Sequence, residues 1–525
     1  MGSMRTTVRP VALATAGLAA VLAVAGCAGA PGSTRASGAS GASRSGAPAP
    51  AVPAPVGRGR PSSGTDGSGA PFDGRTAPAP DEVDPAEVPD STFAMDVDTA
   101  SYGYAKTVLA DGGLPSPDRV RPEEFVNAFR QDYPQPRGDG FTVSMDGARL
   151  PREHRTAGGD VRLLRVGLQT RAEDRAARPD AALTVVVDVS GSMGDPGKLD
   201  VVREALHALV DAGRPDDSLA IVTFSDEARV VQPMTSLRER GRLHAAIDEL
   251  RAEGSTGLED GLVTGYRVAR EGFRAGATNR VVLLSDGLAN VGATDADSIL
   301  GQVREQASRE RGQAVTLLGV AVGRDYGDAM MEQLADHGDG VVVYVDAAEQ
   351  AKRAFVDTLP AALPVRALDA KVQVTFDRRQ VAGYRLVGYD DRRLAGEDFR
   401  DDRVDGGEVF AGHAVTALYL VRLRPGADGP VAHTQLRWQD PSTHEARETG
   451  ADVAVGDLGG ALEQAAPRLQ ADYAAAFFAE QLRDGPDRGA VPAGYLARLA
   501  ARAADRTDDG DVRELADLIG RTADR

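Results

Sequence analysis

Short apolar stretches alternate with amphipathic segments between Ala182 and about Pro360, and this alternation restricts the fold more than any other feature of the sequence. Each apolar stretch is rich in Val, Leu and Ile, which is typical of strands that are buried on both faces. The segments between them repeat apolar residues at helical spacing, as Leu199, Val202 and Leu206 do. Strands that alternate with helices predict a doubly wound α/β domain with a mostly parallel sheet.

The predicted elements of this domain follow one another in a regular order. The strands are LTVVVDVS, SLAIVTFS, NRVVLLSDG, AVTLLGVAVG and GVVVYVD, and the helices are 197–212, 238–252, 257–273, 295–311, 327–336 and 347–358. The stretch EARVVQPMT directly after the second strand is expected to form a short antiparallel edge strand.

Apolar residues recur at every second position on both sides of this domain, which is typical of antiparallel strands. The strands are GFTVSMDGARL and VRLLRVGLQT before the domain, and DAKVQVTF, YRLVGYDD, AVTALYLVRLR, TQLRWQD and DVAVGDL after it. Two strands alone are marginal, and the ends of a compact domain often lie close together. We therefore predict one β-sandwich-like module built from both blocks, with the α/β domain inserted between them.

Helical patterns occur near both ends of the ordered region. A short strand and a helix with Tyr104 and Val108 on one face are predicted within STFAMDVDTASYGYAKTVLADGG. A second helix is predicted to start at Pro122 in RPEEFVNAF. The C-terminal tail repeats apolar residues four apart, as in Leu469 and Tyr473, and is predicted to be helical.

The N-terminus has the composition of an export signal. Arg5 and Arg9 precede an apolar stretch that ends in VAGC, with Cys27 as the single cysteine of the chain. The VAGC ending resembles the lipobox of bacterial lipoproteins, in which the cysteine becomes the lipidated first residue. An ordinary signal peptide with an incidental cysteine is the alternative. From 28 to about 90 the chain is mostly Gly, Ala, Ser and Pro, which predicts a disordered tether.

The net charge of −18 and the lack of a dense basic run argue against nucleic acid as a partner. The basic residues are almost all arginine, and only four are lysine. With one cysteine, the chain has neither an internal disulfide nor a cysteine-based metal site.

Three oxygen-bearing side chains end the first strand of the α/β domain. TVVVDVSGSMG runs from apolar residues into Asp188, Ser190 and Ser192. Doubly wound sheets bind ligands outside the carboxyl ends of their strands, where the strand order reverses, and the first strand normally flanks that point. Spacing by two in an extended turn directs the three side chains to one place, and Gly191 and Gly194 allow the backbone to bend.

Two further oxygen donors are expected from loops on the same edge of the sheet. EGSTGLEDG precedes a helix and offers Thr256, and VVLLSDG ends a buried strand with Asp286. Carboxylate and hydroxyl oxygens suit Mg²⁺ or Mn²⁺ in octahedral geometry, with Ca²⁺ a poorer match. The five residues form an incomplete shell, which leaves a position for an acidic side chain of a partner.

This set resembles the metal-ion-dependent adhesion site of von Willebrand factor type A domains. The match covers about 182–358 and includes DVSGS, the threonine of GSTGLEDG and the aspartate of LLSDG. The resemblance implies that Asp188, Ser190 and Ser192 bind the ion. It also implies that Thr256 and Asp286 complete the site directly or through water.

The flanks resemble those of bacterial secreted proteins that carry one type A domain between family-specific N-terminal and C-terminal regions. The segments that carry this likeness are STFAMDVDTASY, RPEEFVNAF, YRLVGYDDR and EDFRDDRVDGGEVFAGHAVTALY. The predicted regions are a lipoprotein signal peptide (1–27), a tether (28–90), an N-terminal region (91–175), a type A domain (176–362), a β-rich module (363–458) and a helical C-terminal region (459–525).

These features predict a recognition protein that is lipid-anchored at the extracytoplasmic face of the cell membrane. Its type A domain is expected to bind a protein partner through a divalent ion, with the partner offering an Asp or Glu. One alternative is an assembly factor of the envelope that binds neighbours without using the ion. Another is a metal-dependent hydrolase, although no general base is evident near the motif and we expect a protein without enzymatic activity.

We infer no functional role for several other polar residues. DVDTA, with Asp96 and Asp98, is similar to the start of haloacid dehalogenase-type phosphotransferases, but no compatible domain follows at once. Asp226 begins a turn and is expected to be solvated. His207 and His244 are expected on helices, where they face solvent or a groove.

Overall fold

The computed structural model describes most of the chain between residues 82 and 523, all within the second of two compact units, Gly74–Arg525. The described residues are 82–95, 99–155, 158–172, 178–286, 298–299, 301, 315–323, 341–345, 355, 365–390, 393–394, 399–400, 407, 409–441 and 443–523. The predicted signal peptide with Cys27, nearly all of the tether, Asp96 and Asp98 lie outside them. So do nearly all residues of the helices predicted at 295–311, 327–336 and 347–358.

A six-stranded sheet forms the α/β domain, in the order β6-β5-β4-β7-β8-β9. The strands are β4 (Ala181–Asp188), β5 (Ser218–Phe224), β6 (Ala228–Ser236), β7 (Thr278–Ser285), β8 (Thr316–Val322) and β9 (Val341–Val345). All pairs are parallel except β5 with β6, which confirms the predicted antiparallel edge strand. Because β5 and β7 lie on either side of β4, the strand order reverses at β4. The carboxyl end of β4 is therefore the point where such sheets bind ligands.

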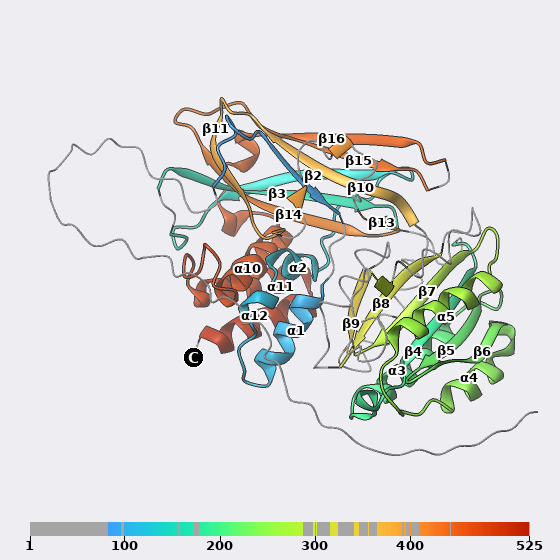
Figure 1. Ribbon diagram of the computed structural model, residues 1–525. Helices are drawn as coiled ribbons and strands as arrows, with labels where there is room; N and C mark the ends of the chain where they lie inside the picture. The colour runs from blue at the N-terminus through green and yellow to red at the C-terminus, as the bar shows by residue number, and fades with distance from the viewer. Residues whose placement is uncertain are drawn as a thin grey trace, which may run out of the picture. The chain divides into compact units, whose positions relative to one another are not determined.

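Helices cover both faces of this sheet (Figure 1). The helices are α3 (Leu199–Ala212), α4 (Arg240–Asp248) and α5 (Leu258–Glu271). Neighbouring residues of a strand point to opposite faces, so Val185 and Val187 of β4 share a core with α3 and α4, whereas Val186 packs in the core of α5. The doubly wound fold predicted from the sequence is confirmed.

The strands before and after the α/β domain combine in two further sheets, in the orders β12-β1-β10-β15-β16, with β13 beside β10, and β11-β14-β3-β2. Their bounds are β1 (Asp90–Ala94), β2 (Phe141–Arg149), β3 (Asp160–Thr170), β10 (Val365–Phe376), β11 (Val381–Leu386), β12 (Arg393–Leu394), β13 (Val409–Phe410), β14 (Ala414–Leu423), β15 (Pro430–Gln439) and β16 (Ala446–Ala454). In each sheet an N-terminal strand pairs antiparallel with a C-terminal one, β1 with β10 and β3 with β14. The predicted sandwich-like module with an inserted domain is therefore confirmed.

The two sheets of the sandwich share one apolar core. Trp438 is 5% exposed and meets the ring of Phe141 edge-on, with 4.9 Å between the ring centroids. Trp438 thus packs inside the β module, and it brings an N-terminal and a C-terminal strand into contact.

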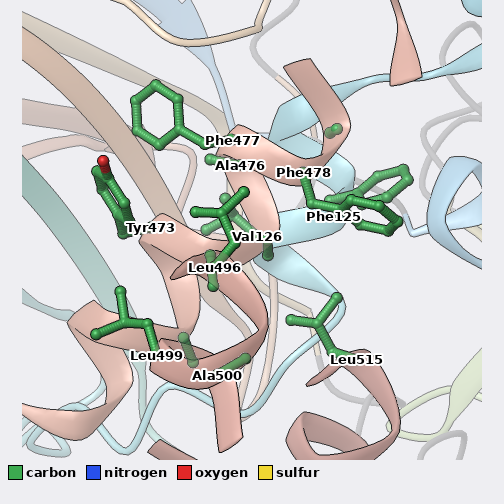
Figure 2. Close-up of a cluster of buried hydrophobic side chains, with 14 of the residues drawn as sticks. Phe125, Val126, Tyr473, Ala476, Phe477, Phe478, Leu496, Leu499, Ala500 and Leu515 are labelled. Atoms are coloured by element: carbon green, nitrogen blue, oxygen red, sulfur yellow. The ribbon is translucent and has the colours of Figure 1, made fainter. Parts of the chain in front are cut away.

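A layer of helices covers the other face of the β11-β14-β3-β2 sheet. The helices are α2 (Pro122–Asn127), α10 (Pro467–Leu482), α11 (Ala493–Thr507) and α12 (Gly510–Ala523). Leu163 of β3 packs in this helical core, whereas Leu164 packs inside the sandwich. Figure 2 shows Phe125 of α2 beside Phe478 of α10, and the two ring centroids are 6.3 Å apart.

Helix α1 (Ala100–Ala110) belongs to two cores. Ala105 and Leu109 join the helical core, and Tyr104 packs with Val108 in the α5-side core of the α/β domain. The predicted face with Tyr104 and Val108 is confirmed. Among the described residues, no helix combines the length and the apolar composition needed to cross a bilayer.

Candidate metal site

Asp188 is the last residue of β4, and each of its carboxylate oxygens accepts a hydrogen bond. The backbone N–H of Ser190 donates to Oδ1 over 2.8 Å, and the hydroxyl of Ser285 donates to Oδ2 over 2.6 Å. The residue is 0% exposed. Burial raises the pKa of Asp188 to about 6. The neighbouring Asp286 carboxylate adds to the rise, and the hydrogen bonds from Ser190 and Ser285 oppose it.

The turn after β4 brings two hydroxyl groups together. Ser190 Oγ and Ser192 Oγ are 3.1 Å apart, and Ser190 is buried. Residues Gly191–Gly194 form one 3-10 turn directly after Ser190. The two hydroxyls and the carboxylate of Asp188 therefore lie at the switch point of the sheet, as the spacing predicts.

The loop before α5 is joined to this turn by backbone hydrogen bonds. Gly191 N donates to Gly254 O over 3.1 Å, and Glu253 N donates to Val189 O over 2.6 Å. Thr256 follows in the same loop and is 2% exposed. These bonds hold the segment that carries Thr256 against the turn of Ser190 and Ser192.

Asp226 fixes this loop, a role that was not expected from the sequence. Its Oδ1 accepts the backbone N–H of Ser255 over 3.0 Å, and the hydrogen bonds from Ser255 lower the pKa of the Asp226 carboxyl. Gly254 has φ +73°, and a Cβ there would lie 2.7 Å from Asp226 Oδ2, so this position favours glycine. Asp226 is exposed, as expected, yet it positions the Thr256 loop. The sequence feature that could have indicated this role is an acidic residue just after a buried strand.

Asp286 follows β7 and is 0% exposed. Its Oδ2 accepts a hydrogen bond from the ammonium of Lys198 over 3.1 Å. Within the described part of the chain, its Oδ1 has no hydrogen-bond partner. A buried carboxylate oxygen without a partner is unfavourable, and a coordinated cation would satisfy it. Sequence reasoning missed Lys198, although a rare lysine beside the motif was a usable signal.

The donors on this edge fit a hard divalent cation. They comprise a pair of adjacent hydroxyls and two buried carboxylates, one of which has an oxygen without a hydrogen bond from the described residues. In the described ranges, no three His, Cys, Asp or Glu side chains are grouped to hold a metal. An ion here would therefore depend on the serine and threonine hydroxyls as well. The five-residue ligand set, Asp188, Ser190, Ser192, Thr256 and Asp286, stays a prediction.

His207 of α3 and His244 of α4 are partly exposed and also contact each other. Their Nδ1 atoms are 2.7 Å apart, and the rings stack with 5.0 Å between centroids. Each Nε2 lies near a carboxylate, Asp248 at 3.2 Å and Asp211 at 3.1 Å. This pair joins the two helices, and the spacing of the two histidines in the sequence did not predict it.

Three protein-family models match the chain. The von Willebrand factor type A domain model matches residues 182–357. A model described as the C-terminal part of the uncharacterized protein YfbK matches 361–427. A model described as von Willebrand factor matches 78–157.

Among curated proteins, the chain is similar to the uncharacterized protein YfbK of Escherichia coli strain K12. The two are 34% identical over 390 residues, which cover 69% of this chain and 66% of YfbK. An uncharacterized protein of Synechocystis is 28% identical over 194 residues, which cover 37% of this chain and 44% of that protein. The chain thus spans just under two thirds of the first relative and less than half of the second.

The solved structures that are similar to the chain include the following two. A von Willebrand factor type A protein from Catenulispora acidiphila is 16% identical with a TM-score of 0.41, covering 73% of this chain and 91% of that chain. The ArnB paralog of Sulfolobus acidocaldarius is 16% identical with a TM-score of 0.35, covering 73% of this chain and 97% of that chain.

Proposed function

We propose that this protein binds a protein partner outside the cytoplasm through a divalent cation. The chain is homologous to YfbK and carries a von Willebrand factor type A domain between regions with YfbK-family counterparts. Lipid on Cys27 anchors it to the cell membrane in this proposal, and the tether separates the binding domain from the membrane surface. The type A domain itself indicates protein–protein interaction or adhesion.

The observation that best supports cation-dependent binding is the state of Asp286. Its carboxylate is fully buried at the switch point, close enough to Asp188 to raise the pKa of that residue, and Oδ1 lacks a hydrogen bond from the described residues. Two buried carboxylates side by side repel each other. A divalent ion removes this repulsion, which gives the arrangement a physical reason.

The residues of this edge would divide the work of holding the ion. Asp188 is already oriented by Ser190 and Ser285, so its carboxylate is fixed before any ion arrives. Ser190 and Ser192 add neutral oxygens, and the Asp226-bound loop brings in Thr256. When bound, Mg²⁺ or Mn²⁺ supplies a positive charge for a carboxylate of the partner.

The test compares the wild-type chain with Asp188→Ala. Calorimetric titration with Mg²⁺ and Mn²⁺ should show binding to the wild type and none to the variant, while far-UV circular dichroism stays nearly unchanged. Asp216→Ala is the matched control, because Asp216 is exposed and lies just before β5, at the amino end of a strand that runs parallel to β4. Unchanged metal affinity in Asp188→Ala would remove the proposal.

Partner capture from envelope extract, with and without chelator, separates the proposed function from its alternatives. Capture that requires both the metal and Asp188 supports adhesion through the ion. Capture that survives chelation and Asp188→Ala supports an assembly factor that does not use the ion. Metal-dependent hydrolysis of a phosphoester or a peptide would support an enzyme instead.

A further inference from the structure

Lys198 places a positive charge inside the candidate metal site. Its Nζ lies 3.1 Å from Asp286 Oδ2, and the lysine side chain is 7% exposed. A second carboxylate, Asp195, is 3.7 Å away but 69% exposed, so water screens that contact. The short contact to the buried Asp286 is therefore the significant one.

The fold is shaped around the stem of this lysine. Gly323 follows β8 with φ +93°, and a Cβ built on it would lie 2.9 Å from Lys198 Cε and 3.1 Å from Cγ. A side chain at 323 would therefore displace the lysine stem. Lys198 also directly precedes α3, and its carbonyl accepts the backbone N–H of Val202 over 3.0 Å. Both ends of the side chain are thus positioned by neighbouring elements.

The charges at this edge do not balance without a cation. Asp188 receives its hydrogen bonds from two neutral donors, Ser190 N–H and Ser285 hydroxyl. Asp286 receives one from Lys198. Across the described ranges, Lys198 is the one basic side chain that forms an ion pair with either carboxylate. The ammonium therefore supplies part of the positive charge that a divalent ion would bring.

We propose that Lys198 is a built-in counter-ion that stabilises the metal-free site and competes with the divalent cation for Asp286. This inference rests on the proposed metal site. An ammonium and a divalent cation at the same carboxylate repel each other, so the ion binds at the expense of the Lys198–Asp286 contact. Lys198 thus lets the domain fold without metal and lowers its affinity for the ion.

The experiment compares Lys198→Met with the wild-type full chain. Methionine keeps an apolar stem beside Gly323 and removes the charge. Titration with Mn²⁺ and Mg²⁺ should show roughly tenfold tighter binding to the variant, since one unit charge beside the ion has been removed. In chelator the variant should melt at a lower temperature than the wild type, and its gain in melting temperature on adding metal should be larger.

Two controls separate charge from packing. Lys198→Arg keeps the positive charge and should bind metal with nearly wild-type affinity. Asp195→Asn removes only the exposed partner and should change neither affinity nor metal-free stability. If Lys198→Met folds poorly, Lys198→Gln is the second neutral variant, because its amide can donate a hydrogen bond to Asp286, and it should also bind metal more tightly.

The outcomes distinguish this inference from the metal site itself. If the wild type and the neutral variants all fail to bind Mn²⁺ and Mg²⁺, both proposals fall. If all bind with equal affinity, or the neutral variants bind more weakly, the metal site stands and the role of Lys198 is overturned. If Lys198→Met requires metal to fold and the wild type does not, this result supports the proposed role of Lys198.

Discussion

The hydroxyl of Ser285 donates a hydrogen bond to Asp188 Oδ2 over 2.6 Å and thereby joins the carboxyl ends of two neighbouring parallel strands, β7 and β4. Both residues are fully buried. The bond fixes the carboxylate without neutralising it, so its ionised form stays unfavourable in the absence of a cation.

This arrangement predicts that metal stabilisation depends on pH. The pKa of the Asp188 carboxyl is 3.8, its ordinary value, in the unfolded chain and about 6 in the fold. Because the folded value is higher, its contribution to metal-free stability is complete below about pH 4 and is lost as the pH rises through about 6. Metal binding requires the ionised carboxylate. The rise in melting temperature caused by Mg²⁺ should therefore be largest above about pH 7 and shrink as the pH falls through about 6.

Differential scanning calorimetry with and without Mg²⁺, at about pH 5 and about pH 7.5, measures this effect. Asp188→Asn is the control, because it cannot ionise and should show no such change between the two pH values. An equal metal-induced shift at both pH values in the wild type would contradict the assignment of Asp188 as the titrating ligand.

A buried ion pair joins β3 to α10 and predicts a stability difference. Arg165 Nη1 lies 2.8 Å from Asp472 Oδ2, and the side chains are 5% and 1% exposed. Asp472→Ala removes one partner of the buried Arg165 guanidinium and should lower the free energy of unfolding by about 3 kcal/mol. Urea unfolding followed by the fluorescence of Trp438, the single tryptophan of the chain, measures this loss in the sandwich.

The same arginine provides the control. Arg165 also pairs with Asp146, which is 43% exposed, over 2.7 Å. Water can partly replace the exposed Asp146 carboxylate, so Asp146→Ala should lower the free energy of unfolding by less than about 1 kcal/mol. If both variants lost the same unfolding free energy, burial would not determine how much each ion pair of Arg165 stabilises the fold.

The shared sandwich predicts that two fragments need each other. β3 pairs with β14 along ten successive positions, from Asp160 with Leu423 to Gln169 with Ala414. Fragments 91–175 and 363–525 should each be poorly ordered alone, and mixing them should produce binding and a gain of strand signal in circular dichroism. Fragment 176–362, which lacks sandwich strands, should fold alone. Cooperative melting of 91–175 by itself would refute this prediction.

The proposed membrane anchor predicts an effect of replacing Cys27, the single cysteine of the chain. Because VAGC resembles a lipobox, Cys27→Ser should release the protein from the membrane fraction or leave its signal peptide uncut. Cell fractionation and the mass of the mature N-terminus measure this. A variant that is cut correctly and still fractionates with membrane would contradict lipid attachment at Cys27.

The sequence predicted the fold well because its strongest patterns are local. Buried strands and amphipathic helices repeat with clear periods, and the insertion followed from too few strands before Ala182. The end of α2 was harder to predict. Phe129 continues the helical spacing, yet the helix ends at Asn127, whose side chain bonds both the carbonyl and the N–H of Thr416 on β14. A tertiary contact there overrides the local period.

Residues of the candidate site could be proposed from the sequence where they are neighbours in one turn, follow a strand end or, like Thr256, precede a helix. Asp188, Ser190 and Ser192 share one turn, and Asp286 ends a buried strand. Lys198 reaches Asp286 across 88 positions of the chain. That contact depends on how α3 packs against β7 and β8, which no local pattern encodes.

The pairing of early strands with late ones also has a consequence for the time course of folding. Asn127 and its partner Thr416 are 289 residues apart, with the whole inserted domain between them. As the chain emerges, β1, β2 and β3 appear before the inserted domain, and β3 has apolar residues on both faces, Leu163 and Leu164. The inserted domain can fold through contacts within its own segment, whereas β3 cannot pair with β14 until β14 has been synthesised. The interval before β14 arrives is therefore when the growing chain is most exposed to aggregation.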